Sequence, residues 1–223
     1  MRFELPGGAG ALFTTRAHGN LSTLLGERPE RGRRERDRLC GELGLRWVCA
    51  SRQVHGTIVQ RVRTQDGSGG EAVALDADGH ATALRGVGVM VLVADCLPVL
   101  LASDGVVAAL HAGWRGLAAG VLEEGVRAVR ELGGGGEIVA LVGPGAGPCC
   151  YAVGAEVHAA LGGAQRVGAR NIDLPALAHE RLVAAGVGRV ERVGTCTICD
   201  TRLYSHRREG ERAGRQAGVA WLS

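Results

Sequence analysis

The sequence contains no lysine, few aromatic residues and little net charge. All 26 basic residues are arginines, a bias that, together with 37 glycines, indicates GC-rich coding rather than a functional choice. Only two Phe, three Trp and two Tyr are present, so aromatic platforms for stacking nucleic-acid bases are scarce. With a net charge of +3, the composition argues against a nucleic-acid partner.

The sequence also lacks the segments that direct a chain to a membrane or out of the cell. No run of about 18 apolar residues could span a bilayer. No apolar region follows a basic start, as it does in a signal peptide. Seven cysteines are an odd number without the dense spacing of a small secreted scaffold. We therefore expect a cytoplasmic protein with no membrane partner, whose thiols are free or bound to metal.

The hydrophobic content is high enough for a substantial core. At 223 residues and 46% hydrophobic content, with no repeat or linker in view, we expect one domain over residues 1–223. VGVMVLVAD and EIVALVG predict strands buried on both faces. Apolar residues at helical spacing predict helices in RGLAAGVLEEGVRAVREL and DLPALAHERLVAAG, the second capped by Asp173. Interspersed strands and helices indicate a mixed α/β class.

The first third of the sequence carries weaker signals. A strand is expected over Ala11–Arg16. The charges of Glu27–Arg38 alternate in sign, which indicates the solvated face of a helix. WVCASRQVHGTIVQRVR predicts one or two strands, because β-branched residues alternate with polar ones. TQDGSGGE is expected to be a loop.

The clearest chemical signal lies in VADCLPVLLASDGVVAALHAGWRG, which runs from Val93 to Gly116. Asp104 and Gly105 predict a two-residue hairpin turn between two apolar arms. Ser103 then faces Val106, and this pairing fixes the register of both arms.

The same register places His111 opposite Pro98. Opposite residues share a face of the sheet, and so do residues two positions apart. Cys96 and His111 are therefore expected as diagonal neighbours, with Cβ atoms about 5–8 Å apart. That separation suits two ligands of one tetrahedral zinc ion or a thiol–imidazole hydrogen bond. The two residues could thus be metal ligands, a nucleophile with its base, or buried bystanders.

A third ligand would favour the metal. His55 ends a strand-like segment in RQVHG and stands beside a glycine, which leaves room for close approach. The separations between His55, Cys96 and His111, 41 and then 15 residues, match no local metal-binding pattern. The residues alone leave the choice open.

Five segments, in this order, resemble the YfiH family: RQVHG, ADCLPVLL, HAGWRG, GPGAGPCCYAVG and CTICDTRLYSHRREGERAGRQAG. The family is also called the multicopper polyphenol oxidase or laccase-domain family and includes the mammalian immune regulator FAMIN. The resemblance runs from about Thr14 to Leu222. It implies a layered α/β/β/α arrangement with mixed sheets, similar to the catalytic domain of cytotoxic necrotising factors. It also implies that His55, Cys96 and His111 bind one zinc ion, with copper as the alternative metal.

The resemblance further implies an enzyme of purine nucleoside metabolism. Family members are reported to phosphorolyse adenosine, inosine and S-methyl-5′-thioadenosine, and to deaminate adenosine. Three protein ligands leave a fourth position open, as in catalytic zinc sites, and zinc lowers the pKa of a bound water towards about 7. The expected partners are a purine nucleoside and phosphate, bound by a monomer or homodimer.

Phosphorolysis also requires an anion site. Arg115 in GWRG is the first candidate, because a helix is expected to begin there and its N-terminus favours phosphate. Arg16 in TTRAHG is the second candidate, followed by Arg207 and Arg208. A surface or structural role is the alternative for each arginine.

Asp95 directly precedes the candidate cysteine ligand. As a carboxylate beside a metal site it could orient His55 or His111, which would add it to the catalytic residues. A turn residue at the end of a strand is the equally open interpretation.

Four further cysteines could form a structural zinc site: Cys149, Cys150, Cys196 and Cys199. Adjacent cysteines make poor tetrahedral partners, so we expect buried thiols near the active cleft instead. Four other histidines show no partner pattern and are expected at the surface or at helix caps: His18, His80, His158 and His179.

Three other functions stay open. Cys96 could be the nucleophile and His111 the base of a Cys-dependent amidase, including a peptidoglycan-editing hydrolase, an activity linked to some bacterial relatives. The older family name implies a copper phenol oxidase (laccase), but one cysteine and two histidines fall short of a blue-copper site plus a trinuclear cluster. A zinc-stabilised partner of the division or cell-wall machinery is the non-catalytic alternative.

Overall fold

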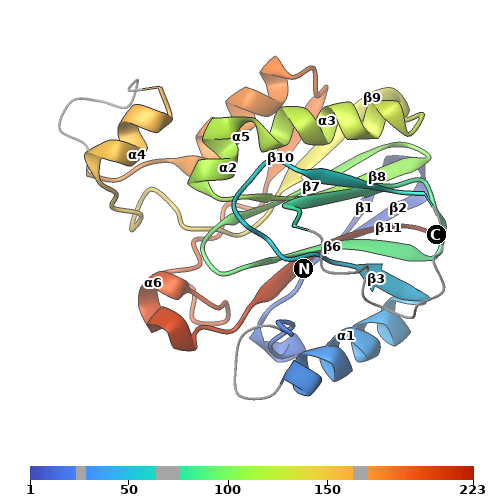
Figure 1. The fold of residues 1–223 in the computed structure, drawn as a ribbon, viewed down its shortest axis with the longest axis horizontal. Coiled ribbons are helices and arrows are strands. Elements are labelled where there is room, and N and C mark those ends of the chain that lie inside the picture. The colour runs from blue at the N-terminus through green and yellow to red at the C-terminus, as the bar shows by residue number, and fades with distance from the viewer. Residues whose placement is uncertain (24–28, 64–75, 163–169) are drawn as a thin grey trace.

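The computed structural model describes residues 1–23, 29–63, 76–162 and 170–223. Two β-sheets pack face to face, and helices cover their outer faces (Figure 1). Each sheet contains both parallel and antiparallel pairs. The predicted mixed α/β class with a layered α/β/β/α arrangement is confirmed.

The first sheet has the strand order β1-β2-β11-β6-β3. Its neighbours are antiparallel except for β3, which runs parallel to β6. The strand expected over Ala11–Arg16 lies earlier, as β2, and VGVMVLVAD forms β6 as predicted. The strands are β1 (Arg2–Leu5), β2 (Ala9–Phe13), β11 (Gln216–Leu222), β6 (Val87–Val93) and β3 (Trp47–Cys49).

The second sheet has the strand order β10-β9-β7-β8-β5-β4, with parallel pairs at both edges. WVCASRQVHGTIVQRVR therefore forms two strands in different sheets, β3 and β4, and the RQVHG segment crosses between them. The strands are β10 (Arg189–Arg192), β9 (Gly135–Val142), β7 (Leu97–Asp104), β8 (Val106–Ala112), β5 (Gly79–Thr82) and β4 (Val59–Val62).

The hairpin of β7 and β8 has the predicted register. Ser103 pairs with Val106, and Pro98 pairs with His111. Gly105 has a φ of 72°, which a glycine adopts without strain in a tight hairpin turn. The pairing derived from the sequence is confirmed.

The side chains of β8 alternate between two cores. Ala108 and Leu110 pack against the helices, whereas Val107 and Ala109 pack against the first sheet. His111 continues the second series by alternation, and it lies where the inter-sheet core ends. An imidazole thereby reaches the rim of the sandwich from a strand that is otherwise apolar.

Helices α2, α3 and α5 cover the outer face of the second sheet, and α1 covers that of the first (Figure 1). No helix among the described residues has the length and apolarity needed to cross a membrane. The helices are α1 (Pro29–Leu43), α2 (Trp114–Ala119), α3 (Val121–Glu131), α4 (Ala155–Ala160), α5 (Leu174–Ala184) and α6 (His206–Glu209), with 3-10 turns η1 (Pro6–Gly8), η2 (Arg16–His18) and η3 (Gly210–Arg212).

The three predicted helices are present; two of them differ from the prediction in their extent. The continuous helix expected after the hairpin is broken at Gly120, whose φ of 100° ends α2 and begins α3. The charged helix α1 extends beyond Arg38 and buries Leu39 and Cys40 against the first sheet. Asp173 caps α5 as predicted, accepting a hydrogen bond from the backbone of Ala176 at 2.9 Å. The predicted loop TQDGSGGE lies outside the described residues.

Truncating the inter-sheet core should destabilise the protein. Leu100 is fully buried between the sheets, so we expect Leu100→Ala to lower the free energy of unfolding by about 2–5 kcal/mol. Val183→Ala is the control, because Val183 is 53% exposed and its truncation should change stability by less than ~0.5 kcal/mol. Chemical denaturation followed by circular dichroism measures both, and equal effects would contradict this account of the core.

Candidate active site

A cavity of about 580 Å³ opens where β6 and β8 end and β7 begins. Its walls come from both sheets, from the RQVHG crossing and from the C-terminal segment that precedes β11. The lining includes the three candidate ligands, two aromatic rings and three arginines: His55, Cys96, His111, Trp114, Tyr151, Arg115, Arg207 and Arg215.

The structure brings His55, Cys96 and His111 together, with one donor atom of each within 4.8 Å of the others. The Cys96 sulfur lies 3.8 Å from His55 Nε2. The rings of His55 and His111 meet edge to face with centroids 4.8 Å apart. His111 is buried, Cys96 is half-buried and His55 is exposed, so the group faces the cavity from its floor. One thiol and two imidazoles are donors that zinc and copper both accept.

A glycine makes this approach possible. A Cβ atom placed on Gly113 would lie 2.8 Å from Cδ2 of His55 and 3.0 Å from the sulfur of Cys96. Any side chain there would displace one of the candidate ligands. The HAGWRG motif therefore supplies one candidate ligand, His111, and also the space for the other two.

One buried carboxylate orients both histidines. Asp78 Oδ1 contacts Nδ1 of His111 at 2.7 Å. The same carboxylate accepts hydrogen bonds from the backbone N–H groups of Val54, His55 and Gly56 at 3.1, 2.9 and 2.7 Å. His55 has a φ of 60°, an unfavourable value for a side chain with a Cβ. The hydrogen bonds to Asp78 hold that turn, and the Nδ1 contact leaves Nε2 as the free nitrogen of His111.

The site's charges are strongly coupled. Burial alone would raise the pKa of Asp78, but hydrogen bonds from His111 and the backbone lower it below its usual value. Burial would also raise the pKa of Cys96, yet His111 and His55 outweigh it and lower that pKa to about 6. The pKa of His111, which burial alone would lower, is raised to about 9 by Cys96 and Asp78. Metal-free protein thus favours a thiolate beside an imidazolium.

Of the two roles left open for Asp95, its contacts favour that of a turn residue at the end of a strand. Its φ is 87°, and its carboxylate accepts hydrogen bonds from the Thr197 hydroxyl at 2.6 Å and the Arg207 backbone at 2.7 Å. Asp95 therefore fastens the C-terminal segment to the cavity, and Asp78 orients the histidines. Sequence reasoning missed Asp78 because ALDADGH belongs to no motif; its only signal is a carboxylate at the start of a short strand.

Two of the four predicted arginines line the cavity. Arg115 is exposed and lies over the ring of Trp114, with its guanidinium carbon 4.2 Å from the ring centroid. Arg207 lies over the ring of Tyr151, with its guanidinium carbon 4.9 Å from the ring centroid. Arg215 also lines the cavity and was not singled out from the sequence, although it lies in the long C-terminal motif. Burial lowers the pKa of Arg215 against the opposing effect of Cys96 and Asp95.

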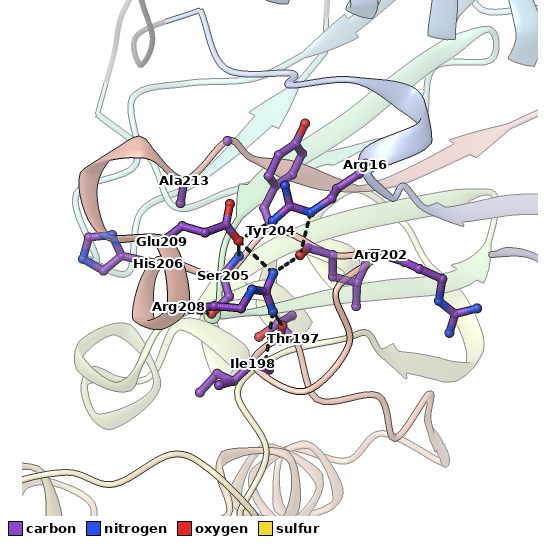
Figure 2. A network of polar contacts seen from close by, with 12 residues as sticks. Arg16, Thr197, Ile198, Arg202, Tyr204, Ser205, His206, Arg208, Glu209 and Ala213 are labelled. Carbon is purple, nitrogen blue, oxygen red and sulfur yellow. Dashed lines mark hydrogen bonds and ion pairs between the residues drawn. The ribbon is translucent and has the colours of Figure 1, made fainter.

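The other two predicted arginines do not line the cavity. Figure 2 shows Arg16 and Arg208 converging on Glu209. Arg208 also donates to the carbonyl oxygens of Thr197 and Ile198 at 2.7 and 3.0 Å. Their guanidinium groups hold the C-terminal segment together and do not line the cavity, which agrees with the structural role given above as the alternative.

The other cysteines and one histidine also differ from expectation. Four cysteines were expected as buried thiols near the cleft: Cys149, Cys150, Cys196 and Cys199. Their sulfur atoms instead converge on one another, and Cys149 and Cys199 are exposed.

His80, expected at the surface or at a helix cap, is fully buried, and its Nε2 lies 2.9 Å from the Ser51 hydroxyl. His18 caps η2 together with Thr15, which agrees with the predicted capping role.

Comparison with known proteins identifies the relatives of this chain. Residues 9–223 match the family model described as multi-copper polyphenol oxidoreductase laccase. A Xylella fastidiosa (strain Temecula1) protein named purine nucleoside phosphorylase is 42% identical over 236 residues, covering 97% of this chain and 88% of that protein. A Shigella flexneri protein named purine nucleoside phosphorylase YfiH is 33% identical, covering 99% and 97%. The solved structure of YlmD from Geobacillus stearothermophilus is 30% identical with a TM-score of 0.84, covering 98% and 94%.

The coupled charges predict an unusually reactive thiol in metal-stripped protein. Because His111 stabilises the thiolate, iodoacetamide should modify Cys96 with a midpoint near pH 6, compared with about 8.5 for an ordinary thiol. Asp78→Asn should move that midpoint upwards, because without the carboxylate the pKa of His111 falls and a neutral His111 no longer stabilises the Cys96 thiolate. Asp76→Asn, at an exposed carboxylate paired with Arg52, should not. Peptide mass spectrometry measures the modification, and a wild-type midpoint near pH 8.5 would refute the ion pair.

Proposed function

Because the chain belongs to the multi-copper polyphenol oxidoreductase laccase family, which includes the YfiH proteins, we propose that it is a zinc-dependent purine nucleoside phosphorylase. Its substrates are adenosine, inosine and S-methyl-5′-thioadenosine, and adenosine deamination is a second activity of the same site. The observation that carries the proposal is the convergence of His55, Cys96 and His111 on the floor of a cavity that also presents arginines and aromatic rings.

The donor set fits the metal. His55 Nε2, the Cys96 sulfur and the free Nε2 of His111 would hold it, and the buried Asp78 keeps His111 in the required orientation. A hydrogen-bonded carboxylate behind a histidine ligand is the usual support of such a site. When bound, zinc supplies a Lewis acid with an open coordination position beside the substrate.

The cavity suits a nucleoside and an anion. Its volume of about 580 Å³ lies within the usual range for small-molecule sites. Trp114 and Tyr151 offer aromatic surfaces to a purine, and Arg115, Arg207 and Arg215 offer positive charge to phosphate. In phosphorolysis a phosphate oxygen bonds to the ribose C1′ as the bond from C1′ to the purine breaks, which yields ribose-1-phosphate and the free base. The arginines would hold the nucleophile at that carbon.

Arg115 is the arginine best placed to bind phosphate. Among the described residues, the Arg115 guanidinium stacks on the ring of Trp114 and makes no hydrogen bond or ion pair. Arg207 donates to the carbonyl of Ala152, and Arg215 donates to backbone carbonyls in its own segment. Arg115 therefore keeps its planar group of donors for a ligand.

A second candidate function rests on the same residues. Cys96, His111 and Asp78 are placed as a nucleophile, a base and the carboxylate that orients the base, an arrangement that also serves Cys-dependent amidases. A peptidoglycan-editing hydrolase would use it. The copper phenol oxidase ranks lower, because one thiol and two imidazoles at this site are too few donors for a multi-copper centre.

Metal removal separates the two leading candidates. Zinc-loaded protein incubated with adenosine or inosine and phosphate should release free base and ribose-1-phosphate, measured by liquid chromatography. Chelation should abolish turnover, and added zinc should restore it. Cys96→Ala should lower turnover by at least ~100-fold, because a ligand is lost. Absence of turnover above the Cys96→Ala level would overturn the phosphorylase. Amidase activity that survives chelation and is lost on alkylation of Cys96 would establish the alternative.

Arg115→Ala should selectively weaken phosphate binding. Loss of a charge-assisted hydrogen bond costs about 1.5–3 kcal/mol, so KM for phosphate should rise roughly 10- to 100-fold while KM for inosine changes less. Arg127→Ala is the control, because Arg127 lies exposed on α3 and pairs with Glu124. Initial-rate kinetics at varied phosphate measures both variants. An unchanged KM for phosphate in Arg115→Ala would remove Arg115 from the anion site.

A further inference from the structure

Four cysteines outside the cavity have sulfur atoms within 4.8 Å of one another: Cys149, Cys150, Cys196 and Cys199. The first two lie in the turn after β9, and the other two in the turn after β10. A β-bridge joins Gly145 to Cys196, and the Thr197 backbone donates to the Gly145 carbonyl at 3.0 Å. The backbone thus holds the two turns side by side.

The sulfur spacing matches ligands of one shared ion. The Cys199 sulfur lies 3.6 Å from that of Cys149 and 3.2 Å from that of Cys150. Tetrahedral zinc with Zn–S bonds of about 2.3 Å separates its sulfur ligands by ~3.8 Å. A disulfide would require about 2.05 Å, and an iron–sulfur cluster places its thiolates on different iron atoms. The distances favour a single tetrahedral ion.

A backbone donor aimed at one of the sulfurs provides a second observation. The Gly147 N–H donates to the Cys196 sulfur at 3.2 Å. Such a hydrogen bond suits a thiolate, which is the form of cysteine that binds metal. A Cβ on Gly147 would lie 3.4 Å from the Cys196 sulfur and 3.1 Å from its Cβ, so a side chain would crowd the group.

The adjacent cysteines are accommodated by their turn. The Cys150 and Tyr151 backbones both donate to the Gly147 carbonyl at 3.0 Å. This tight turn brings the sulfurs of Cys149 and Cys150 to the same group, although neighbouring residues in an extended chain point apart. The objection from sequence adjacency therefore does not hold for this backbone.

We propose that Cys149, Cys150, Cys196 and Cys199 bind one zinc ion in a closed tetrahedral site, separate from the cavity. Each thiol gives up its proton on binding. With all four positions filled by protein, this ion has no coordination position for a substrate, so its role is structural.

The residues next to these ligands form the cavity wall. Tyr151 follows Cys150 and lines the cavity. Thr197 follows Cys196 and donates its hydroxyl to Asp95. Arg208 holds the carbonyls of Thr197 and Ile198 inside the C-x-x-C turn (Figure 2). The zinc ion therefore joins the Tyr151 wall to the C-terminal segment that carries Arg207 and Arg215.

Zinc stoichiometry tests the proposal without any substrate. The Cys96→Ala full-length protein, purified under reducing conditions and dialysed against buffer with a weak chelator, should retain one zinc ion per chain by plasma mass spectrometry. Adding Cys199→Ser to that background should remove it and lower the melting temperature. Adding Cys40→Ala, which removes a thiol outside both groups, should leave the zinc content unchanged. Zinc retained in the Cys199→Ser protein would overturn the proposal.

A measurement on protein that keeps all four cysteines covers the case in which Cys199→Ser does not fold. X-ray absorption at the zinc edge of the Cys96→Ala protein should show four sulfur neighbours at about 2.3 Å. A shell containing nitrogen or oxygen, iron in place of zinc, or an intact mass two hydrogens lighter because of a disulfide would each refute the proposed site. Because the Cys96→Ala protein lacks a cavity ligand, these results stand apart from the outcome for the phosphorylase.

Discussion

The candidate active site depends on the buried carboxylate of Asp78. Burying a charge costs several kcal/mol unless hydrogen bonds and opposite charge compensate it, and Asp78 collects four donors, from His111 and from the three backbone N–H groups of the RQVHG turn. That turn crosses between the sheets, whereas His111 lies one residue before the end of β8 in the second sheet. One carboxylate thus fixes two histidines that the chain brings from unrelated elements. The strained backbone of His55 persists because these bonds determine it.

The sequence predicted the parts of the site that rest on local rules. Asp104-Gly105 fixed the hairpin register, and with it the proximity of Cys96 and His111, because side chains alternate strictly along a strand. His55 required the family resemblance, since no spacing rule reaches across 41 residues. Asp78 could not be found by either route. Its role arises only when β5 pairs with β8, which brings the carboxylate against His111.

The arginines show why residue type and motif do not identify a ligand site. Arg208 stands in one of the segments that carry the family resemblance and Arg16 stands in TTRAHG, yet both pair with Glu209 and hold the C-terminal segment. Arg115 lines the cavity, and its guanidinium N–H groups donate to no other described residue. At Asp95 the sequence left two roles open, and the choice depends on a positive φ that turns the carboxylate towards Thr197 and Arg207. The tertiary partners of a charged group, which the sequence does not state, decide whether it serves structure or ligand.

The two proposed metal sites differ in net charge, and the difference suits their roles. A zinc ion held by one thiolate and two neutral imidazoles would carry a net charge of +1 and stay electrophilic; of these ligands, His55 is exposed. A zinc ion held by four thiolates would carry −2, with its Lewis acidity quenched and its coordination sphere filled. Asp95 lies between them, because its carboxylate holds Thr197 beside the second group while the next residue, Cys96, serves the first. The hydrogen bond between Asp95 and Thr197 therefore connects the proposed four-cysteine site directly to the residue beside Cys96.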